Sequence, residues 1–119
     1  MPSPTPPPRV RDDMSIDSQR QDALAIWQSG VEAVKPENLI PRVVSLTDGV
    51  LHIRDEVFPL DEWDRLVVVG GGKAGAGMAK ALERVLGEDF CREKVTGWIN
   101  VPDNCVEKLT SIHLHGARP

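Results

Sequence analysis

LVVVGGGKAGAG is the sequence of residues 66–77, in which a short apolar run leads directly into a glycine-rich turn. A valine-rich run of this kind is typical of a strand buried on both faces of a parallel sheet. The glycines leave the turn without side chains, so backbone N–H groups can closely approach an anionic ligand. An apolar helical pattern follows and would direct its positive dipole end at the same place. We therefore expect an anion-binding pocket at the head of a βα unit, with Lys73 inside it.

The segments on either side of this turn predict further helices and strands. Upstream, hydrophobic spacing and turn residues predict helices over 15–34 and 37–46 and short strands over 50–54 and 57–60. Downstream, they predict a helix over 74–86 that ends at Gly87 and strands over 95–100 and 109–114. This order of elements makes about half of a doubly wound sheet. The sequence thus predicts an α/β fold: a three-layer Rossmann-like domain with a mainly parallel sheet, incomplete at the C-terminus.

Composition divides the chain into a tail and a single folded portion. Residues 1–14 are rich in proline, which blocks helix formation and sheet pairing, so we expect a disordered tail. Residues 15–119 form the α/β portion. The whole chain is 40% hydrophobic and 27% charged, which is ordinary for a globular domain. Because no second half of the sheet follows, we expect this chain to be part of a longer protein.

Charge, hydropathy and cysteine content argue against several classes of protein. A net charge of -4 leaves no basic surplus to neutralise nucleic-acid phosphates. No apolar run approaches the roughly 20 residues that span a bilayer, and the first residues do not resemble a signal peptide. Cys91 and Cys105 lack metal-ligand spacing and make no disulfide framework. We therefore expect a cytoplasmic protein that binds neither nucleic acid nor membrane; its oligomeric state is not indicated.

The glycine turn partly matches two nucleotide-binding motifs. Its spacing satisfies G-x-G-x-x-G, which keeps an NAD(P)- or FAD-binding oxidoreductase fragment open as an alternative. That fingerprint also uses an acid near the end of the next strand, whereas the strand here ends in WINV at 98–101 and the first acid after it is Asp103, beyond Pro102. The Walker-type loop G-x-x-x-x-G-K-[ST] fails at two positions, since Val67 replaces its first glycine and Ala74 replaces its hydroxyl residue.

Lys73 supports a third interpretation. A compact ammonium group placed where backbone donors converge can bind a phosphate or carboxylate and can neutralise charge as a phosphoryl group moves. Helix starts favour acids over lysines, so a cation here predicts an anionic partner. A glycine loop at the head of a helix also occurs in regulatory domains that bind a sugar phosphate without chemistry, and a non-catalytic domain of that kind is a further alternative.

Two residues near the end of the chain are added as candidate binding residues. His115 lies near the carboxyl end of the last predicted strand, where open α/β sheets bind their ligands. Arg118 follows it and is interpreted as an anion contact. His113 and His115 alternate on one strand, but no third ligand accompanies them, so we predict no metal site.

Two stretches resemble the N-terminal domain of the class II glycerate 2-kinases, the glycerate kinases whose C-terminal part is the MOFRL domain. They are VVVGGGKA at 67–74 and MAKALE at 78–83, and the resemblance extends from Ser15 to the end of the chain. It implies transfer of the ATP γ-phosphoryl group to the 2-hydroxyl of glycerate, giving 2-phosphoglycerate. ATP and glycerate are then the expected small-molecule partners, and Mg²⁺ follows from the phosphoryl donor.

The resemblance also implies roles for individual residues. Lys73 matches the active-site lysine of the family, and the loop around it would bind substrate or phosphate through Gly70, Gly71, Gly72, Ala74 and Gly75. The family often has a histidine followed by a proline-rich turn after the third strand, which HGARP at 115–119 only approximates. Family members run to several times this length, with further catalytic residues beyond Pro119. We therefore expect this fragment alone to be inactive.

Overall fold

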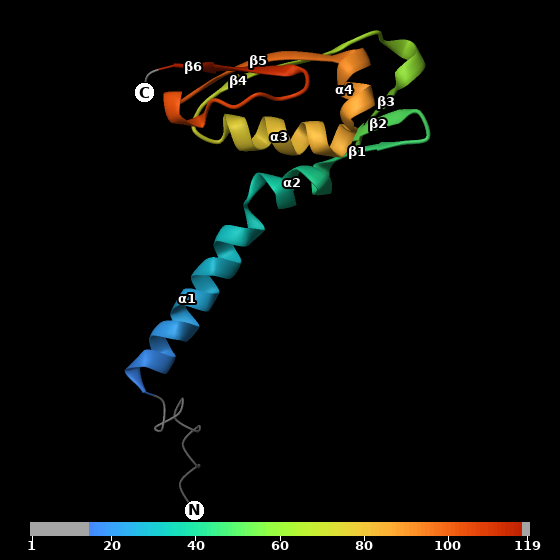
Figure 1. Cartoon of the computed structure of the whole chain (residues 1–119). Coiled ribbons are helices and arrows are strands. Elements are labelled where there is room, and N and C mark those ends of the chain that lie inside the picture. The colour runs from blue at the N-terminus through green and yellow to red at the C-terminus, as the bar shows by residue number, and fades with distance from the viewer. Residues whose placement is uncertain (1–14, 118–119) are drawn as a thin grey trace, which may run out of the picture. The chain divides into compact units, whose positions relative to one another are not determined.

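The structure is a computed structural model that describes residues 15–117 (Figure 1). The chain divides into two compact units between Ala33 and Val34. The first unit contains α1 (Ile16–Ala33), which confirms the first predicted helix. Ser15 precedes it, and its Oγ accepts a hydrogen bond from the N–H of Ser18 at 3.1 Å, as an N-cap does. The predicted tail, residues 1–14, lies outside the described residues.

The second unit begins with a helix and a small antiparallel sheet. Its elements are α2 (Pro36–Val43), β1 (Val44–Thr47), β2 (Val50–Ile53) and β3 (Glu56–Pro59), with β2 in the middle of the sheet. Asp48 and Gly49 have φ values of 51° and 74°, as in the tight turns that join hairpin strands. The predicted helix over 37–46 is wrong in its last residues, because Val44 to Thr47 pair residue by residue with β2.

The remaining elements form a parallel sheet and the helices that connect it. They are the short helix η1 (Leu60–Glu62), β4 (Leu66–Gly71), α3 (Gly75–Leu86), α4 (Glu88–Lys94), β5 (Val95–Val101), the short helix η2 (Asp103–Cys105) and β6 (Ile112–Gly116). The strand order is β4-β5-β6, and both strand pairs are parallel. The predicted α/β class, the helix ending at Gly87 and the parallel sheet are therefore confirmed. The sequence did not indicate α4, and the last strand begins later than predicted.

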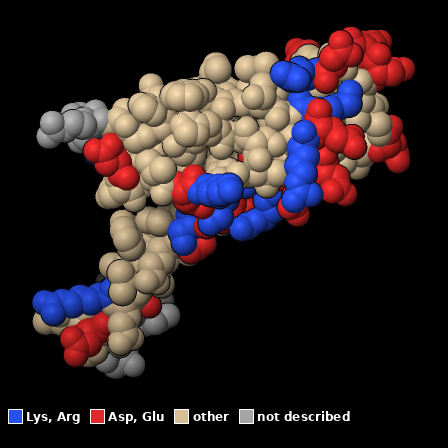
Figure 2. All heavy atoms as spheres, turned by 45° about the horizontal axis from the view of Figure 1, so that its top comes forward, with Lys and Arg blue, Asp and Glu red and all other residues tan. Residues whose placement is uncertain are grey.

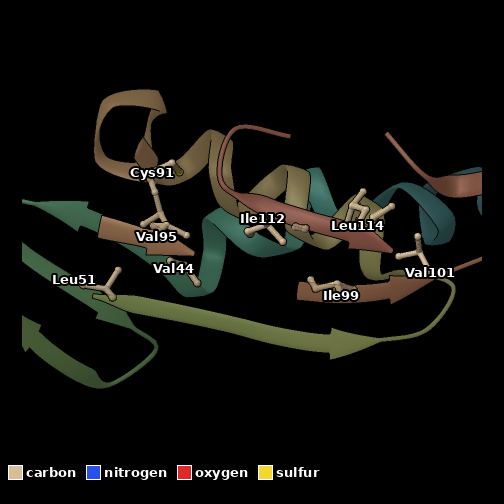
Figure 3. Close-up of a cluster of buried hydrophobic side chains, with 11 residues drawn as sticks. Val44, Leu51, Cys91, Val95, Ile99, Val101, Ile112 and Leu114 are labelled. Carbon is tan, nitrogen blue, oxygen red and sulfur yellow. The ribbon is translucent and has the colours of Figure 1, made fainter. Parts of the chain in front are cut away.

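The core lies between the sheets and α3. Its largest fully buried side chains are Ile112, Val101 and Cys91, and Leu51 of β2 extends the same cluster into the antiparallel sheet. Figure 3 shows the buried side chains gathered between strands and helices. At Gly97 in the middle of β5, a Cβ would lie 2.5 Å from the carbonyl oxygen of Val68. The core is therefore built on close backbone contact between β4 and β5.

Glu83 of α3 has a buried carboxylate that accepts hydrogen bonds from backbone N–H groups. Its side chain accepts hydrogen bonds from three successive N–H groups, those of Thr110 at 2.7 Å, Ser111 at 2.8 Å and Ile112 at 2.9 Å. Charge-assisted hydrogen bonds of this kind are stronger than those between neutral groups. Glu83 thereby ties the start of β6 to the helix that follows the glycine loop.

The other face of the parallel sheet is open in the described residues, so the expectation that β4 is buried on both faces is wrong. Val67 and Val69 are 60% and 75% exposed. Strand register places Trp98 and His113 on the same face, and Figure 2 shows a broad uncharged area where this sheet lies. The reason is topological. The segments that connect the strands pack on one face only, where α3 contacts β5 and holds residues 110–112 through Glu83, so residues 34–117 form no covering layer on the second.

Candidate functional site

The predicted anion pocket corresponds to the loop between β4 and α3. Gly72 has φ 128°, a conformation that L side chains rarely adopt. Its N–H donates to the carbonyl oxygen of Asn100 at 3.0 Å, and the N–H of Gly75 donates to the carbonyl oxygen of Gly72 at 3.1 Å. The first bond ties the loop to β5 and the second closes a tight turn, so the chain passes from strand to helix within a few residues.

The glycines of this loop have different physical roles. A Cβ at Gly75 would lie 2.7 Å from Cγ2 of Ile99 and 3.2 Å from Cγ1 of Val101, so Gly75 allows α3 to pack closely on β5. A Cβ at Gly70 or Gly72 would meet nothing within 4 Å. At those two positions the absence of a side chain leaves backbone open to a ligand, which is the arrangement an anion-binding loop needs.

A cavity of about 430 Å³ lies beside the loop. Every residue from Gly70 to Gly75 lines it, together with apolar side chains that include Ile40 of α2, Met78 of α3 and Ile99 of β5. Its size is within the range of small-molecule sites. The loop residues of the sequence prediction, Lys73 among them, therefore share one cavity at the N-terminus of α3.

Lys73 is exposed and lines this cavity. Among residues 15–117, no ion pair or hydrogen bond involves its ammonium group. Two other lysines of the domain do have partners: Lys80 pairs with Glu107 at 3.3 Å, and Nζ of Lys94 lies 3.4 Å from the carbonyl oxygen of Trp63. The cation beside the glycine loop is thus available to a ligand.

The structure places His115 away from the loop cavity. His115 lies in β6 opposite Asn100 of β5, on the open face of the sheet, and does not line the cavity. Its ring centroid is 5.1 Å from that of Trp98, which also lies 4.3 Å from the ring of His113. Arg118, the other predicted anion contact, lies outside the described residues.

The donor set of the loop suits an anion. Backbone N–H groups and an ammonium group can bind phosphate or carboxylate oxygens, and neither is a ligand for a cation. Residues 15–117 contain no group of three His, Cys, Asp or Glu side chains arranged to hold a metal ion. In the same part of the chain, no helix combines the length and the apolar character that crossing a bilayer requires.

Cys91 is unsuited to act as a nucleophile. Its side chain is fully buried, and its Sγ faces the carbonyl oxygen of Glu83 at 3.7 Å. Burial, with a smaller contribution from the charge of Glu83, raises the pKa of the Cys91 thiol to about 11. The thiol is therefore protonated near neutral pH.

Asn100 is a residue of interest that the sequence did not single out. Its carbonyl oxygen holds the loop through Gly72, and its side-chain Oδ1 accepts a hydrogen bond from Nε1 of Trp98 at 2.9 Å. The signal in the sequence was its position at the end of the second strand, where a dinucleotide site carries an acid. A single neutral residue there was not recognisable as part of a site.

The fold and the loop together define an α/β domain with an anion-suited glycine loop at the head of a helix. The model of a family described as "Domain of unknown function (DUF4147)" matches residues 22–119. In fold, the chain is similar to the PH0495 protein from Pyrococcus horikoshii OT3, with a TM-score of 0.64 and 20% sequence identity. That likeness covers 83% of this chain and 21% of the other.

Curated proteins that are similar to this chain in sequence are named glycerate kinases. The chain is 40% identical to a glycerate kinase of Bos taurus and 39% identical to that of Homo sapiens over 84 residues, and 32% identical to that of Danio rerio over 89 residues. The chain therefore belongs to the glycerate kinase family that contains this domain. The matches to the two mammalian proteins cover 69% of this chain and 15% of each relative. The resemblance inferred from the sequence is confirmed.

Proposed function

We propose that the polypeptide containing this chain is a glycerate 2-kinase, which transfers the γ-phosphoryl group of ATP to the 2-hydroxyl of glycerate to give 2-phosphoglycerate. The observation that carries the proposal is the unpaired Lys73 beside the cavity lined by the glycine loop. Membership of the glycerate kinase family supports the choice of glycerate as acceptor. Residues 15–119 are then the N-terminal portion of the α/β domain of this kinase, which acts in the cytoplasm.

In this proposal, Lys73 is the catalytic residue that binds and neutralises anionic oxygen during phosphoryl transfer. The loop from Gly70 to Gly75 binds phosphate or substrate through backbone N–H groups, at the positive end of the α3 dipole. Mg²⁺, when bound with the nucleotide, neutralises phosphate charge. Arg118 is proposed as a further contact to the bound substrates, whereas His115, on the open face of the sheet, is given no role at the loop.

The test is release of ADP by the complete gene product with ATP, Mg²⁺ and D-glycerate. Lys73→Ala is compared with Lys80→Ala, which removes a lysine of α3 that pairs with Glu107 and does not line the loop cavity. We expect Lys73→Ala to lower kcat by about 100-fold or more, because a preorganised electrostatic contact to the transition state is lost. Lys80→Ala should retain activity.

Two outcomes would contradict the proposal at different points. Glycerate-dependent turnover that is unchanged in Lys73→Ala would keep the reaction and reject the role of Lys73. A folded wild-type protein without glycerate-dependent turnover would reject the reaction, and the glycine loop would then be tested with a sugar phosphate or a dinucleotide.

A further inference from the structure

We propose that the free edge of β4 pairs with a further parallel strand that is apolar on both of its faces. The strand belongs to the part of a glycerate kinase polypeptide that this chain does not contain. The match covers 15% of each mammalian relative, so most of each relative lies outside the matched segment. The unpaired edge of β4, the cavities beside it and the open face of the sheet carry this inference, and none of them depends on the proposed reaction.

β4 is an edge strand that lacks the usual protection against further pairing. Among residues 15–117 it pairs with β5 alone, so the backbone groups along its other edge have no strand partner there. Natural proteins protect such an edge with charged residues, proline or a bulge. The sequence of β4, LVVVGG, contains neither a charge nor a proline, and it pairs with β5 in continuous register. This edge is therefore suited to receive another strand.

Two cavities lie along this edge. The cavity beside the glycine loop contacts Val68 to Gly75, and a second cavity of about 350 Å³ contacts Leu66 to Val69. Successive side chains of a strand point to opposite faces, so a cavity that contacts four strand residues in a row lies against the strand edge. Space is therefore open along β4 for the side chains of another strand. The apolar residues that line both cavities are Ile40, Val68, Val69 and Leu82.

The open face of the sheet is consistent with the same added strand. Parallel sheets occur almost only with both faces covered, whereas Val67, Val69 and Trp98 are 60%, 75% and 51% exposed on this face. The connections from β4 to β5 and from β5 to β6 pack on the α3 side of the sheet. Because crossovers are right-handed, a connection that returns from β6 past β4 lies on the opposite, open face. One returning connection therefore covers the exposed side chains and brings a strand to the free edge of β4.

The surroundings of the β4 edge decide which strand fits it. One face of the added strand meets Ile40 and Leu82, and the other face continues the surface of Val67 and Val69. Both faces are apolar, so we expect a continuous run of apolar residues, β-branched ones above all, and not an alternating pattern. Two copies of β4 related by a twofold axis would instead pair antiparallel and leave the open faces of both sheets uncovered.

The added strand also completes the surroundings of the glycine loop. Ligands of doubly wound sheets bind outside the carboxyl ends of two neighbouring strands whose connections lie on opposite faces. The connection from β4 begins with α3 on one face, and the connections of the added strand lie on the other. The strand fills the apolar space along β4, and its carboxyl end lies beside Gly70 and Gly71, where the loop N–H groups remain open to a ligand.

The test is amide hydrogen exchange, resolved to single residues, in the 119-residue chain and in the complete gene product that contains it. Successive N–H groups of a strand point to opposite edges, so those of β4 face β5 and the free edge in turn. We expect the free-edge N–H groups to exchange about 100-fold more slowly, or slower still, in the complete gene product, because a paired strand amide exchanges only when the pair opens. The N–H groups that face β5 are the internal control and should exchange slowly in both forms.

Three outcomes of this experiment would overturn the proposal. Free-edge N–H groups that exchange at the same rate in both forms would show that no strand is added to β4. Slow exchange in the 119-residue chain itself, together with a dimer in sedimentation, would assign the edge to a second copy. An intact mass of 13.1 kDa for the natural gene product, which is the mass of this chain alone, would leave no further segment to supply the strand.

Val69→Lys tests the face beside this edge, and Val57→Lys of β3 is the matched control. The two valines are 75% and 54% exposed in this chain, so both variants of the 119-residue chain should melt within about 3 °C of wild type. In the complete gene product, Val69→Lys should lower the melting temperature by about 5–10 °C or prevent folding, because the covering layer buries an unpaired ammonium group. A shift as small as that of Val57→Lys would show that the face stays open and would overturn the proposal. Hydrogen exchange in the wild-type protein decides the pairing even where this variant does not fold.

Discussion

Replacing Glu83 with alanine is expected to destabilise the domain strongly without touching the loop cavity. Glu83 is 8% exposed, and its carboxylate accepts from the N–H groups of Thr110, Ser111 and Ile112. The N–H of Ile112 belongs to a residue that is 2% exposed, so it loses its partner without gaining water. That loss alone costs about 1–3 kcal/mol. Ser111 is half-buried and Thr110 is exposed, so water can replace part of the lost acceptor at their N–H groups and the loss there costs less free energy.

Together these losses predict that Glu83→Ala lowers the free energy of unfolding by about 3–5 kcal/mol. The measurement is urea denaturation followed by far-UV circular dichroism. Glu93→Ala, on the exposed side of α4, is the matched control and should change the free energy of unfolding by less than about 0.5 kcal/mol. Glu83→Gln should also be destabilising, because an amide nitrogen would face backbone N–H donors. A loss below about 1 kcal/mol in Glu83→Ala would refute the argument that this carboxylate anchors β6.

Three further predictions concern the thiols and the glycine loop. The pKa of the Cys91 thiol is raised in the folded state to about 11. Its contribution to the free energy of unfolding is therefore present below the ordinary thiol pKa of 9.0 and is lost as pH rises toward 11. Cys91→Ala should flatten the pH dependence of the free energy of unfolding between these two values. At pH 8, a thiol reagent should modify Cys105 and spare Cys91, and equal rates would contradict the assigned burial. Gly75→Ala should cost about 1–3 kcal/mol, since its Cβ would overlap Ile99, whereas Gly70→Ala meets open space; equal melting temperatures for these two variants would contradict the packing role of Gly75.

Local sequence patterns were sufficient to predict β4, the glycine loop and α3. The apolar run, the glycine turn and the following helix each depend on residues adjacent in sequence, and β4, the loop and α3 form where those patterns predict. The helix ends at Gly87, where φ is 90°, because glycine adopts that conformation without strain. The candidate loop could therefore be located, and Lys73 singled out, before its surroundings were known.

Pairing and burial were decided only by the tertiary structure. Val44 to Thr47 are a strand because β2 lies beside them, whereas their sequence continues a helical pattern. Val67 and Val69 are exposed because the segments that connect the strands of the parallel sheet pack on its other face. Their exposure therefore depends on the arrangement of the connections and not on the apolar character of the two side chains.

The same distinction holds within the candidate site and its support. A glutamate in a helix ordinarily faces solvent, and Glu83 is buried only because three N–H groups 27 to 29 residues away converge on it. Likewise, the rings of Trp98 and His113 lie together only because β5 and β6 are neighbours in the sheet. The sequence by itself determined the loop, its lysine and the family resemblance. The tertiary structure decided which groups are buried, paired or left open, because those properties depend on partners far away along the chain.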